Sequence, residues 1–294
     1  MASPYEALLT VLESGSFSGA ARIMGYTQSA VSQMVKTLEE RLGVTLLLRS
    51  RTGAELTREG EALLPDIREM ANAERKLSDH AAALRGLEQG AVHIGAFPSV
   101  SGSLLPPAIK RFKEAHPGIR FALHQGLYPE MEDMVREGVV DFSFTDLARP
   151  TEQEEELLYT DAYVVVLPED HPLTALERIP LRFLSEEPFI LLEEGRGGGT
   201  LTEFLKAHSE LNVQYRVADD YGVLNMVENH LGVAILPEVL LQRTDYRVEA
   251  RPLDPPLMRS VGIIYRRKSG LSTAAEAFVR ALREMLQEQD SLQI

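Results

Sequence analysis

The segment that decides the fold covers residues 27–43 and reads Thr-Gln-Ser-Ala-Val-Ser-Gln-Met-Val-Lys-Thr-Leu-Glu-Glu-Arg-Leu-Gly. On a helix, at about 100° per residue, its apolar side chains share one flank: Val31, Met34, Val35, Leu38 and Leu42. The other flank carries Gln28, Ser29, Ser32, Gln33 and Lys36. Amide and hydroxyl side chains can hydrogen-bond to base edges in a major groove, although an ordinary solvated face has the same composition. The segment therefore predicts a helix with one packing face and one face available to DNA.

Two shorter helical segments precede residue 27. Residues 4–14 show apolar periodicity and stop at Gly15, after which Ser16 or Ser18 can cap a short helix. That short helix holds Ala20 and Ala21, whose small side chains let two helices cross closely. Helix, short helix, tight turn and longer helix is the layout of a helix-turn-helix.

After Gly43 the apolar residues alternate, and a loop separates residues 44–48 from residues 55–57. This pattern predicts a small hairpin, or wing. Its tip carries Arg49, Arg51 and Thr52. Loop arginines are most often simply solvated, but beside a recognition helix they can contact phosphates or a minor groove.

Four blocks in this region resemble, in order and spacing, the N-terminal signature of LysR-type transcriptional regulators: residues 16–21, 27–33, 38–44 and 56–60. The sequence departs from the usual pattern at Leu47, where the family commonly has Phe, and at Glu55, where a neutral or basic residue is common. The resemblance implies DNA binding, with Gln28, Ser29, Ser32, Gln33 and Lys36 facing the duplex. Arg49, Arg51 and Thr52 would support them from the wing.

Length and composition describe an ordinary globular protein. The 294 residues suit about two or three domains, with 44% hydrophobic and 25% charged residues. The N-terminus lacks the features of a signal peptide, and no window is apolar enough to cross a bilayer, so we expect a cytoplasmic protein. With no cysteine, disulfides, thiolate zinc sites and cysteine nucleophiles are excluded.

The net charge of −14 is unevenly distributed. Residues 1–60 hold 6 basic and 6 acidic residues, whereas the remainder holds 24 basic and 38 acidic ones. A neutral N-terminal unit can bind DNA when its local basic groups face the duplex and the acidic mass lies elsewhere.

The pattern of residues 57–87 predicts one long helix capped by Thr57. Residues 84–90 end this helix and form a hinge. Its apolar seam follows steps of four and three: Leu63, Ile67, Met70, Leu77, Ala81 and Leu84. Such a narrow seam can pack on its own domain, but the resemblance implies a linker helix that forms a homodimer. A two-fold axis then predicts a dyad-symmetric operator. The resemblance further implies a homotetramer and names RNA polymerase as a possible partner.

From residue 91 onward short strands alternate with helices, which predicts an α/β fold. A loop-rich passage at 147–163 divides the region, and a strand at 258–266 with a helix at 273–288 returns to the first half. We expect three parts: residues 1–60 for DNA binding, 61–90 as linker, and 91–294 for effector binding. Lobe I would cover about 91–160 and 266–294, and lobe II about 161–265, as in the hinged lobes of periplasmic binding proteins. Weaker LysR-type motifs extend the resemblance to about residue 288, and in that family the cleft binds a small effector.

Candidate effector contacts lie where strands end and helices begin, since α/β folds bind ligands there. They are Ser99, Ser101, Tyr128, Thr145, Arg196, Thr200 and Tyr221. The glycine run at 195–199 lacks the Gly-Lys-Ser/Thr ending of a phosphate loop, so a helix-capping loop that touches effector is favoured over nucleotide binding. Nearby acids outnumber the lone Arg196, which argues against an acidic effector unless those carboxylates are helix caps: Asp146, Glu193, Glu194, Asp219 and Asp220.

Nothing in the sequence favours an enzyme. The seven histidines are scattered without metal-ligand spacing, and no Gly-x-Ser-x-Gly elbow occurs. A solute-binding receptor with an appended helical domain is the other alternative, and the missing export signal counts against it. The sequence therefore predicts a DNA-binding regulator that needs no cofactor or metal and responds to a small-molecule effector of unknown identity.

Overall fold

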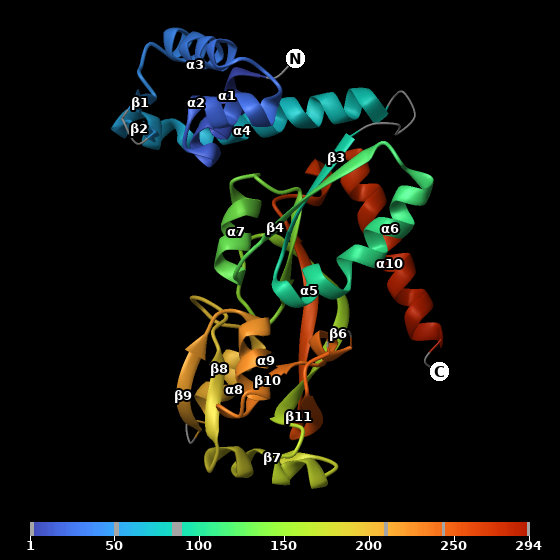
Figure 1. Ribbon diagram of the computed structural model, residues 1–294. Helices are drawn as coiled ribbons and strands as arrows, with labels where there is room; N and C mark the ends of the chain where they lie inside the picture. The colour runs from blue at the N-terminus through green and yellow to red at the C-terminus, as the bar shows by residue number, and fades with distance from the viewer. Residues whose placement is uncertain (1–2, 50–52, 84–89, 209–210, 243–244, 293–294) are drawn as a thin grey trace. The chain divides into compact units, whose positions relative to one another are not determined.

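The computed structural model describes residues 3–49, 53–83, 90–208, 211–242 and 245–292 (Figure 1). Contacts within the chain define two compact units: Met1–Ser78 with Glu137–Val139, and Asp79–Arg136 with Val140–Ile294. Two expected site residues, Arg51 and Thr52, lie outside the described residues, as do the side chain of Arg49 and the hinge at 84–89.

The N-terminal unit is a winged helix-turn-helix, as expected. Its elements are α1 (Pro4–Ser14), α2 (Phe17–Met24), α3 (Gln28–Leu42), β1 (Leu47–Arg49), β2 (Ala54–Leu56) and the first part of α4 (Arg58–Ala83). Hydroxyl oxygens cap the first three helices at Ser3, Ser16 and Thr27, so Ser16 rather than Ser18 caps α2. Left-handed glycines end the same helices at Gly15, Gly25 and Gly43.

One apolar core joins α1, α2, α3, the wing and α4, and it includes Leu8, Ala20, Val31, Val35 and Leu38. The packing flank expected for α3 ends one turn early, because Leu42 is 41% exposed. Leu38 already completes the buried flank, and the chain leaves the helix at Gly43.

The wing is fixed to the helices by two polar contacts. The Glu39 carboxylate accepts the backbone N–H groups of Leu46 (2.7 Å) and Leu47 (3.1 Å). Immediately before β2, a Cβ on Gly53 would lie 2.3 Å from the carbonyl oxygen of Gly15, so this close approach requires glycine. The base of the hairpin is therefore held in place relative to α3.

The helix α4 combines both interpretations of its apolar seam. Thr57 caps it as expected, accepting the N–H of Gly60 at 2.8 Å. Its described part ends at Ala83, short of residue 87, and residues 84–89 are not described. Leu63 and Ile67 pack into the core of their own unit, whereas Met70 and Leu77 are 48% and 70% exposed.

The second unit is an α/β structure, as expected. Its strands are β3 (Gly90–Ala96), β4 (Ile119–Gln125), β5 (Phe142–Asp146), β6 (Glu154–Pro168), β7 (Ile179–Pro180), β8 (Pro188–Leu192), β9 (Asn212–Val217), β10 (Ala234–Pro237) and β11 (Val248–Tyr265). Its α-helices are α5 (Pro98–Ser103), α6 (Leu105–Ala115), α7 (Tyr128–Arg136), α8 (Thr200–Ala207), α9 (Asp220–Glu228) and α10 (Thr273–Leu292). Short 3-10 turns are η1 (Pro172–Ala175), η2 (Leu181–Ser185), η3 (Glu238–Leu241) and η4 (Lys268–Gly270).

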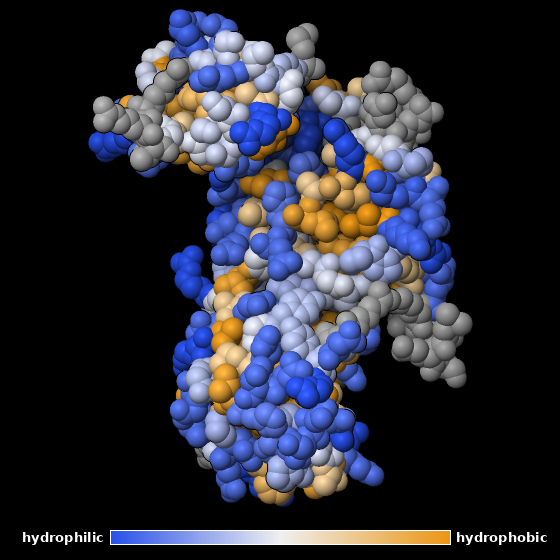
Figure 2. All heavy atoms as spheres, viewed as in Figure 1, coloured by the Kyte–Doolittle hydropathy of each residue, from blue (hydrophilic) through white to orange (hydrophobic). Residues whose placement is uncertain are grey.

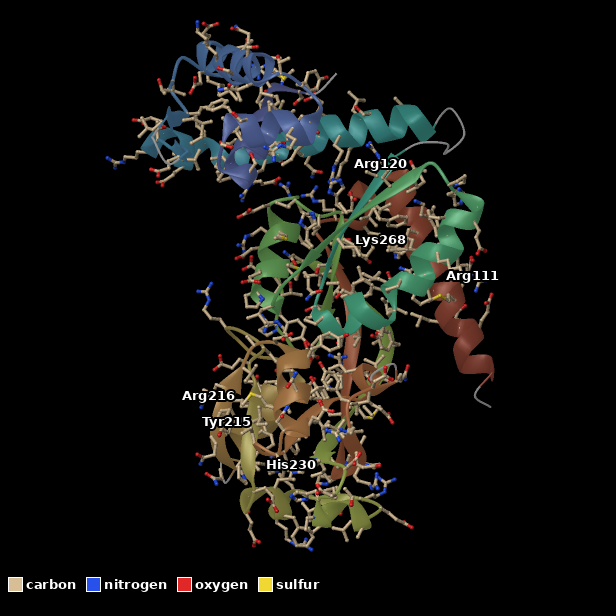
Figure 3. The ribbon with its side chains drawn as sticks, viewed as in Figure 1. Arg111, Arg120, Tyr215, Arg216, His230 and Lys268 are labelled. Carbon is tan, nitrogen blue, oxygen red and sulfur yellow. The ribbon has the colours of Figure 1, made fainter. Side chains whose placement is uncertain are left out.

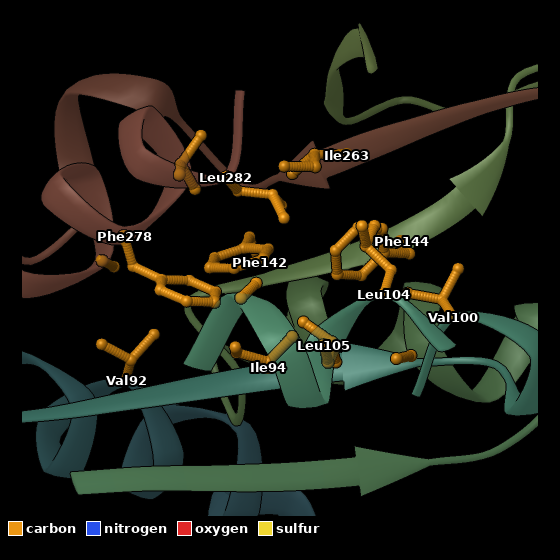
Figure 4. Close-up of a cluster of buried hydrophobic side chains, with 14 of the residues drawn as sticks. Val92, Ile94, Val100, Leu104, Leu105, Phe142, Phe144, Ile263, Phe278 and Leu282 are labelled. Carbon is orange, nitrogen blue, oxygen red and sulfur yellow. The ribbon is translucent and has the colours of Figure 1, made fainter. Parts of the chain in front are cut away.

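The strands form one continuous sheet in the order β10-β6-β11-β5-β3-β4, with β7 beside β11 and a separate β8-β9 pair. Parallel pairing joins β3 to β4 and β5, while β11 runs antiparallel to β5 and β6. Two apolar cores lie along this sheet. The first lobe is built on Val92, Ile94, Phe142, Phe278 and their neighbours (Figure 4), and the second on Val165, Phe189, Leu224 and Ile235 with theirs.

Two long strands run through both lobes (Figure 1). β6 and β11 pair antiparallel from Glu154–Tyr265 to Pro168–Val248. The expected loop at 147–163 is therefore wrong from Glu154 onward, and the strand expected at 258–266 begins at Val248. The exposed acids at 154–156 resemble a loop in composition, but their backbone groups pair with β11. The expected lobe boundary at 265/266 lies at the end of β11, although Val261 and Ile263 already belong to the first-lobe core.

The face of the second lobe drawn in Figure 2 is mainly hydrophilic, in keeping with an apolar core that is buried within it. Among the helices of the described ranges, none combines the length and apolar character that crossing a membrane requires.

Candidate functional site

The polar flank of α3 is accessible. Gln28, Ser29, Gln33 and Lys36 are exposed and Ser32 is partly buried, while Val31, Val35 and Leu38 behind them are buried. Lys36 forms an exposed ion pair with Glu40 one turn later (3.4 Å), and such pairs contribute little to stability. The geometry leaves this flank free of the monomer core, which is what a groove-binding face requires.

A pocket lies between the lobes of the second unit, beside the crossing strands. The empty space within it, including the part that is open to solvent, is about 360 Å³. Its walls are mostly apolar and aromatic, with a few convergent polar groups: Phe97, Pro98, Ser99, Leu127, Tyr128, Tyr163, Leu192, Glu193, Glu194, Ala218, Asp220, Pro237 and Arg259. This composition is that of a small-molecule site.

Arg259 on β11 is the buried cation of the pocket, with 2% of its surface exposed. Its partner Asp161 lies directly opposite on β6, and the carboxylate accepts from Nη2 at 2.6 Å and Nε at 3.1 Å. Nη2 also donates to the hydroxyl of Ser99 at 2.9 Å. Because the Arg259 guanidinium is paired with a carboxylate and hydrogen-bonded, it can remain charged without bulk water.

Two aromatic rings lie against this guanidinium, and a third packs on one of them. Its carbon lies 5.1 Å from the ring centroid of Phe97 and 5.6 Å from that of Tyr163. Tyr128 contacts Phe97 edge to face at 5.0 Å. Burial raises the pKa of the Tyr128 and Tyr163 hydroxyls, so both are neutral hydrogen-bonding groups at any physiological pH.

Asp220 begins α9, is 6% exposed and lines the same pocket. Burial raises the pKa of its carboxyl to about 6 against the lowering effect of Arg259, and the charges of Asp219 and Glu194 add to the rise. No other described side chain donates a hydrogen bond to this carboxyl. It is therefore a poorly compensated acid inside the pocket.

Asp220→Asn is expected to remove a pH-dependent cost. The folded-state pKa of about 6 exceeds the ordinary 3.8, so stability from the bound proton is fully present below pH 4 and is lost as the pH rises through 6. The variant does not titrate, so its stability relative to the parent should rise by about 2 to 3 kcal/mol between pH 4 and pH 7. Urea unfolding of both proteins at pH 4, 5, 6 and 7 measures this; parallel curves would contradict the assignment.

The remaining acids near the pocket serve mainly as caps. Glu194 accepts the backbone N–H groups of Gly199 (3.0 Å) and Thr202 (3.2 Å) at the start of α8. Asp219 caps α9. Glu193 is more exposed and forms an ion pair at 3.7 Å with Arg216, which Figure 3 labels on β9.

Two side chains, one at the end of β5 and one just after it, connect the lobes behind the pocket. Asp146 accepts the backbone N–H of Thr200 at 2.7 Å and its hydroxyl at 3.0 Å. A Cβ on Gly199 would lie 2.8 Å from the Asp146 carboxylate, so the glycine permits this approach. The start of α8, at the end of the glycine loop, is therefore capped by an acid from the other lobe.

Arg149 supplies the second connection. Its Nε and Nη2 donate to the two carboxylate oxygens of Glu132 at 2.7 and 3.2 Å. Its Nη1 donates to the carbonyl oxygens of Arg196, at 3.2 Å, and Gly198. A bidentate arginine thus holds the glycine loop against α7.

The seven expected effector contacts are not all together. Ser99 and Tyr128 line the pocket. Thr145 is 3% exposed within β5, and Thr200 bonds to Asp146. The other three, Ser101, Arg196 and Tyr221, are absent from the pocket lining, with Ser101 bonded to Gln125 at 2.8 Å.

Sequence reasoning missed Arg259, Asp161 and Tyr163. The expectation of a lone Arg196 is corrected, because Arg259 lines the pocket and Arg149 lies behind it. All three missed residues belong to the crossing strands, and a strand pattern alone does not reveal which side chain ends in a cleft. The one available signal was a charged residue, Arg259, within an apolar strand that the sequence did predict.

Matches to known protein families cover almost the whole chain. Residues 4–61 match the bacterial regulatory helix-turn-helix protein, lysR family, and residues 85–287 match the LysR substrate binding domain. The chain is 33% identical to the uncharacterized HTH-type transcriptional regulator YvbU of Bacillus subtilis, covering 94% of this chain and 95% of that protein. It is also 33% identical to the probable HTH-type transcriptional regulator LrrA of Synechococcus elongatus, covering 96% of each chain.

Solved structures share the fold. A full-length OxyR variant from Pseudomonas aeruginosa superimposes with a TM-score of 0.70 at 22% identity, covering 97% of this chain and 93% of that one. Full-length CbnR complexed with its target DNA gives a TM-score of 0.68 at 19% identity, covering 96% and 98%.

Proposed function

Because the chain belongs to the LysR family of DNA-binding transcriptional regulators, we propose that it couples operator binding to occupancy of the pocket around Arg259. The observation that carries the proposal is a mostly apolar pocket with a buried cation on a strand that runs through both lobes. A ligand that contacts both lobes changes their equilibrium only by its differential affinity for the open and closed forms. The chain has no cysteine, so its signal is bound rather than sensed by thiol oxidation.

The DNA contacts we propose are Gln28, Ser29, Ser32, Gln33 and Lys36 on α3, with Arg49, Arg51 and Thr52 on the wing. Support comes from the accessible polar flank of α3 and the polar contacts that hold the base of the wing beside it. We also propose the domain limits 1–60, 61–90 and 91–294. As a DNA-binding regulator, the protein is proposed to act in the cytoplasm.

Gln28→Ala and Gln33→Ala are each expected to weaken binding to the cognate operator by about 1 to 3 kcal/mol and to relax base preference. Each glutamine is exposed and supports no core packing, so the fold should be unchanged. Fluorescence anisotropy on an operator isolated from genomic fragments measures the loss. Gln242→Ala, an exposed glutamine of the second unit, is the matched control; equal affinities for all three variants would reject the assigned face.

We propose that the exposed part of α4 forms the homodimer. Met70 and Leu77 lie seven residues apart and leave an apolar stripe uncovered in the chain. A dimer places two α3 helices on half-sites of a dyad-symmetric operator, and pairing of dimers gives the homotetramer, with RNA polymerase as the further partner of an activator. Sedimentation of the full chain tests this, and a monomer at micromolar concentration would reject the dimer.

Footprinting of the operator with and without a pocket ligand tests the coupling. Ligand binding is expected to change the protected length or the affinity. Unaltered footprints at saturating ligand would mean that the pocket does not control DNA binding.

A further inference from the structure

We propose that the pocket takes a small zwitterion, an α-amino acid or a close derivative, whose carboxylate binds at Arg259 and Ser99 and whose ammonium group binds at Asp220. This inference rests on the proposed function and specifies the ligand class of the same pocket. It follows from two groups of opposite charge, both buried, that line one pocket.

The carboxylate end is built around the guanidinium. Asp161 and Ser99 accept hydrogen bonds from Nε and Nη2 of Arg259, and the Tyr128 hydroxyl also hydrogen-bonds to the guanidinium. Asp161 is the one carboxylate that pairs with Arg259 among the described residues. Ser99 accepts its hydrogen bond from Arg259, so its own hydroxyl proton is directed elsewhere. A ligand carboxylate at this point would receive a charge-assisted hydrogen bond from Arg259 and a second one from Ser99.

The ammonium end is built around Asp220. The neighbouring acids already have donors, because Asp219 caps α9 and Glu194 accepts two backbone N–H groups and the hydroxyl of Tyr163 at 3.1 Å. Asp220 is the pocket acid that lacks a side-chain donor within the described part of the chain. A ligand ammonium group would supply both the missing charge and the missing donors.

The charge balance separates a zwitterion from simpler ligands. Arg259 and Asp161 compensate each other, which leaves Glu194 and Asp220 as pocket acids with no paired cation among the described residues. A plain carboxylate would gain Arg259 but would meet these acids, and a plain amine would gain Asp220 but would meet Arg259. An amino acid has a charged group for each end of the pocket. Its side chain can pack on the apolar wall, which is formed by Phe97, Leu127, Leu192 and Pro237.

The first test uses the purified full chain and the twenty common L-amino acids, each at millimolar concentration, in a thermal-shift assay followed by titration calorimetry. At least one should raise the melting temperature. For that amino acid, the analogue without the amine and the analogue without the carboxylate should each bind about tenfold or more weakly. Equal affinity for the deaminated acid would overturn the proposal.

The second test assigns each end to a residue. Asp220→Asn should weaken binding of the amino acid by about tenfold, while the deaminated acid should bind at least as tightly as before because a repelling negative charge is gone. Ser99→Ala should weaken binding of both acids and leave the decarboxylated amine unchanged. A merely structural role would weaken all three ligands together. Asp170→Asn, an exposed acid of the second lobe, is the control and should change none of them.

The two levels of the hypothesis fail differently. If a broader set of carboxylic acids, sugars and amines contains a ligand but no amino acid binds, the zwitterion assignment is overturned and the regulator with a ligand pocket stands. If an amino acid binds and the Asp220→Asn variant binds it with the same affinity as the parent protein, the assignment of the ammonium site is overturned. If nothing in the set binds, the pocket has no effector role and both proposals are rejected.

Discussion

Asp161→Ala is expected to lower the free energy of unfolding of the second unit by about 3 to 5 kcal/mol, the usual cost of leaving a buried charge unpaired. The carboxylate is the one acidic partner of Arg259 among the described residues, and both side chains are at most 8% exposed. Chemical denaturation monitored in the second unit measures the loss.

The control is the double replacement Asp161→Ala with Arg259→Met, which removes both charges and fills the space of the arginine with an apolar side chain. This variant should regain most of the lost stability, because apolar pairs of similar volume can replace buried ion pairs at little cost. It should also lose ligand binding, since it lacks the pocket cation. A loss below about 1 kcal/mol for Asp161→Ala alone would show that Arg259 is solvated and not dependent on its partner.

Local signals predicted the N-terminal unit closely. The limits of α1, α2 and α3 follow from capping hydroxyls and left-handed glycines that lie within a few residues of each helix end. The exposed flank of α3 follows from helical periodicity alone. Leu42 marks the limit of that method, because periodicity gives direction around the helix but not the extent of the core.

The crossing strands could not be found in this way. β6 and β11 pair residues about 100 positions apart, such as Asp161 with Arg259, and long-range pairing leaves no local signature. The acidic start of β6 and the prolines of β11 further resemble loop composition. As a result the sequence predicted two lobes and a cleft but missed the residues at its centre.

The expected effector contacts show the same limit. Strand ends and helix starts identified Ser99 and Tyr128, which do line the pocket. The rule also selected Thr145 and Thr200, which serve the fold instead: one is buried in β5, and the other bonds to Asp146. Position at a strand end places a residue near a cleft, whereas the direction of its side chain depends on packing that sequence does not reveal.

Phe278→Ala should be as costly as the loss of Asp161, at about 3 to 5 kcal/mol, because it leaves a large cavity in the first lobe. The ring is fully buried (Figure 4) and meets Phe112 edge to face at 5.3 Å, Phe121 at 4.9 Å and Phe142 at 6.4 Å. Hydrogen exchange in the first lobe and denaturant unfolding measure the loss.

Phe278→Leu keeps part of the volume and should cost less, about 1 to 2 kcal/mol, so the pair separates cavity formation from loss of any side chain. The prediction concerns more than packing, because Phe278 belongs to α10, the segment that returns to the first lobe after the chain has built the second. Arg111, labelled in Figure 3, ties α6 to the same helix through Glu288. Exposed ion pairs contribute little, so the apolar face of α10, with Phe278 as its aromatic residue in the core, must hold the helix in place. If Phe278→Ala cost less than about 1 kcal/mol, α10 would not be an integral part of the first lobe, and the lobe would depend on β3, β4 and β5 with α6 alone.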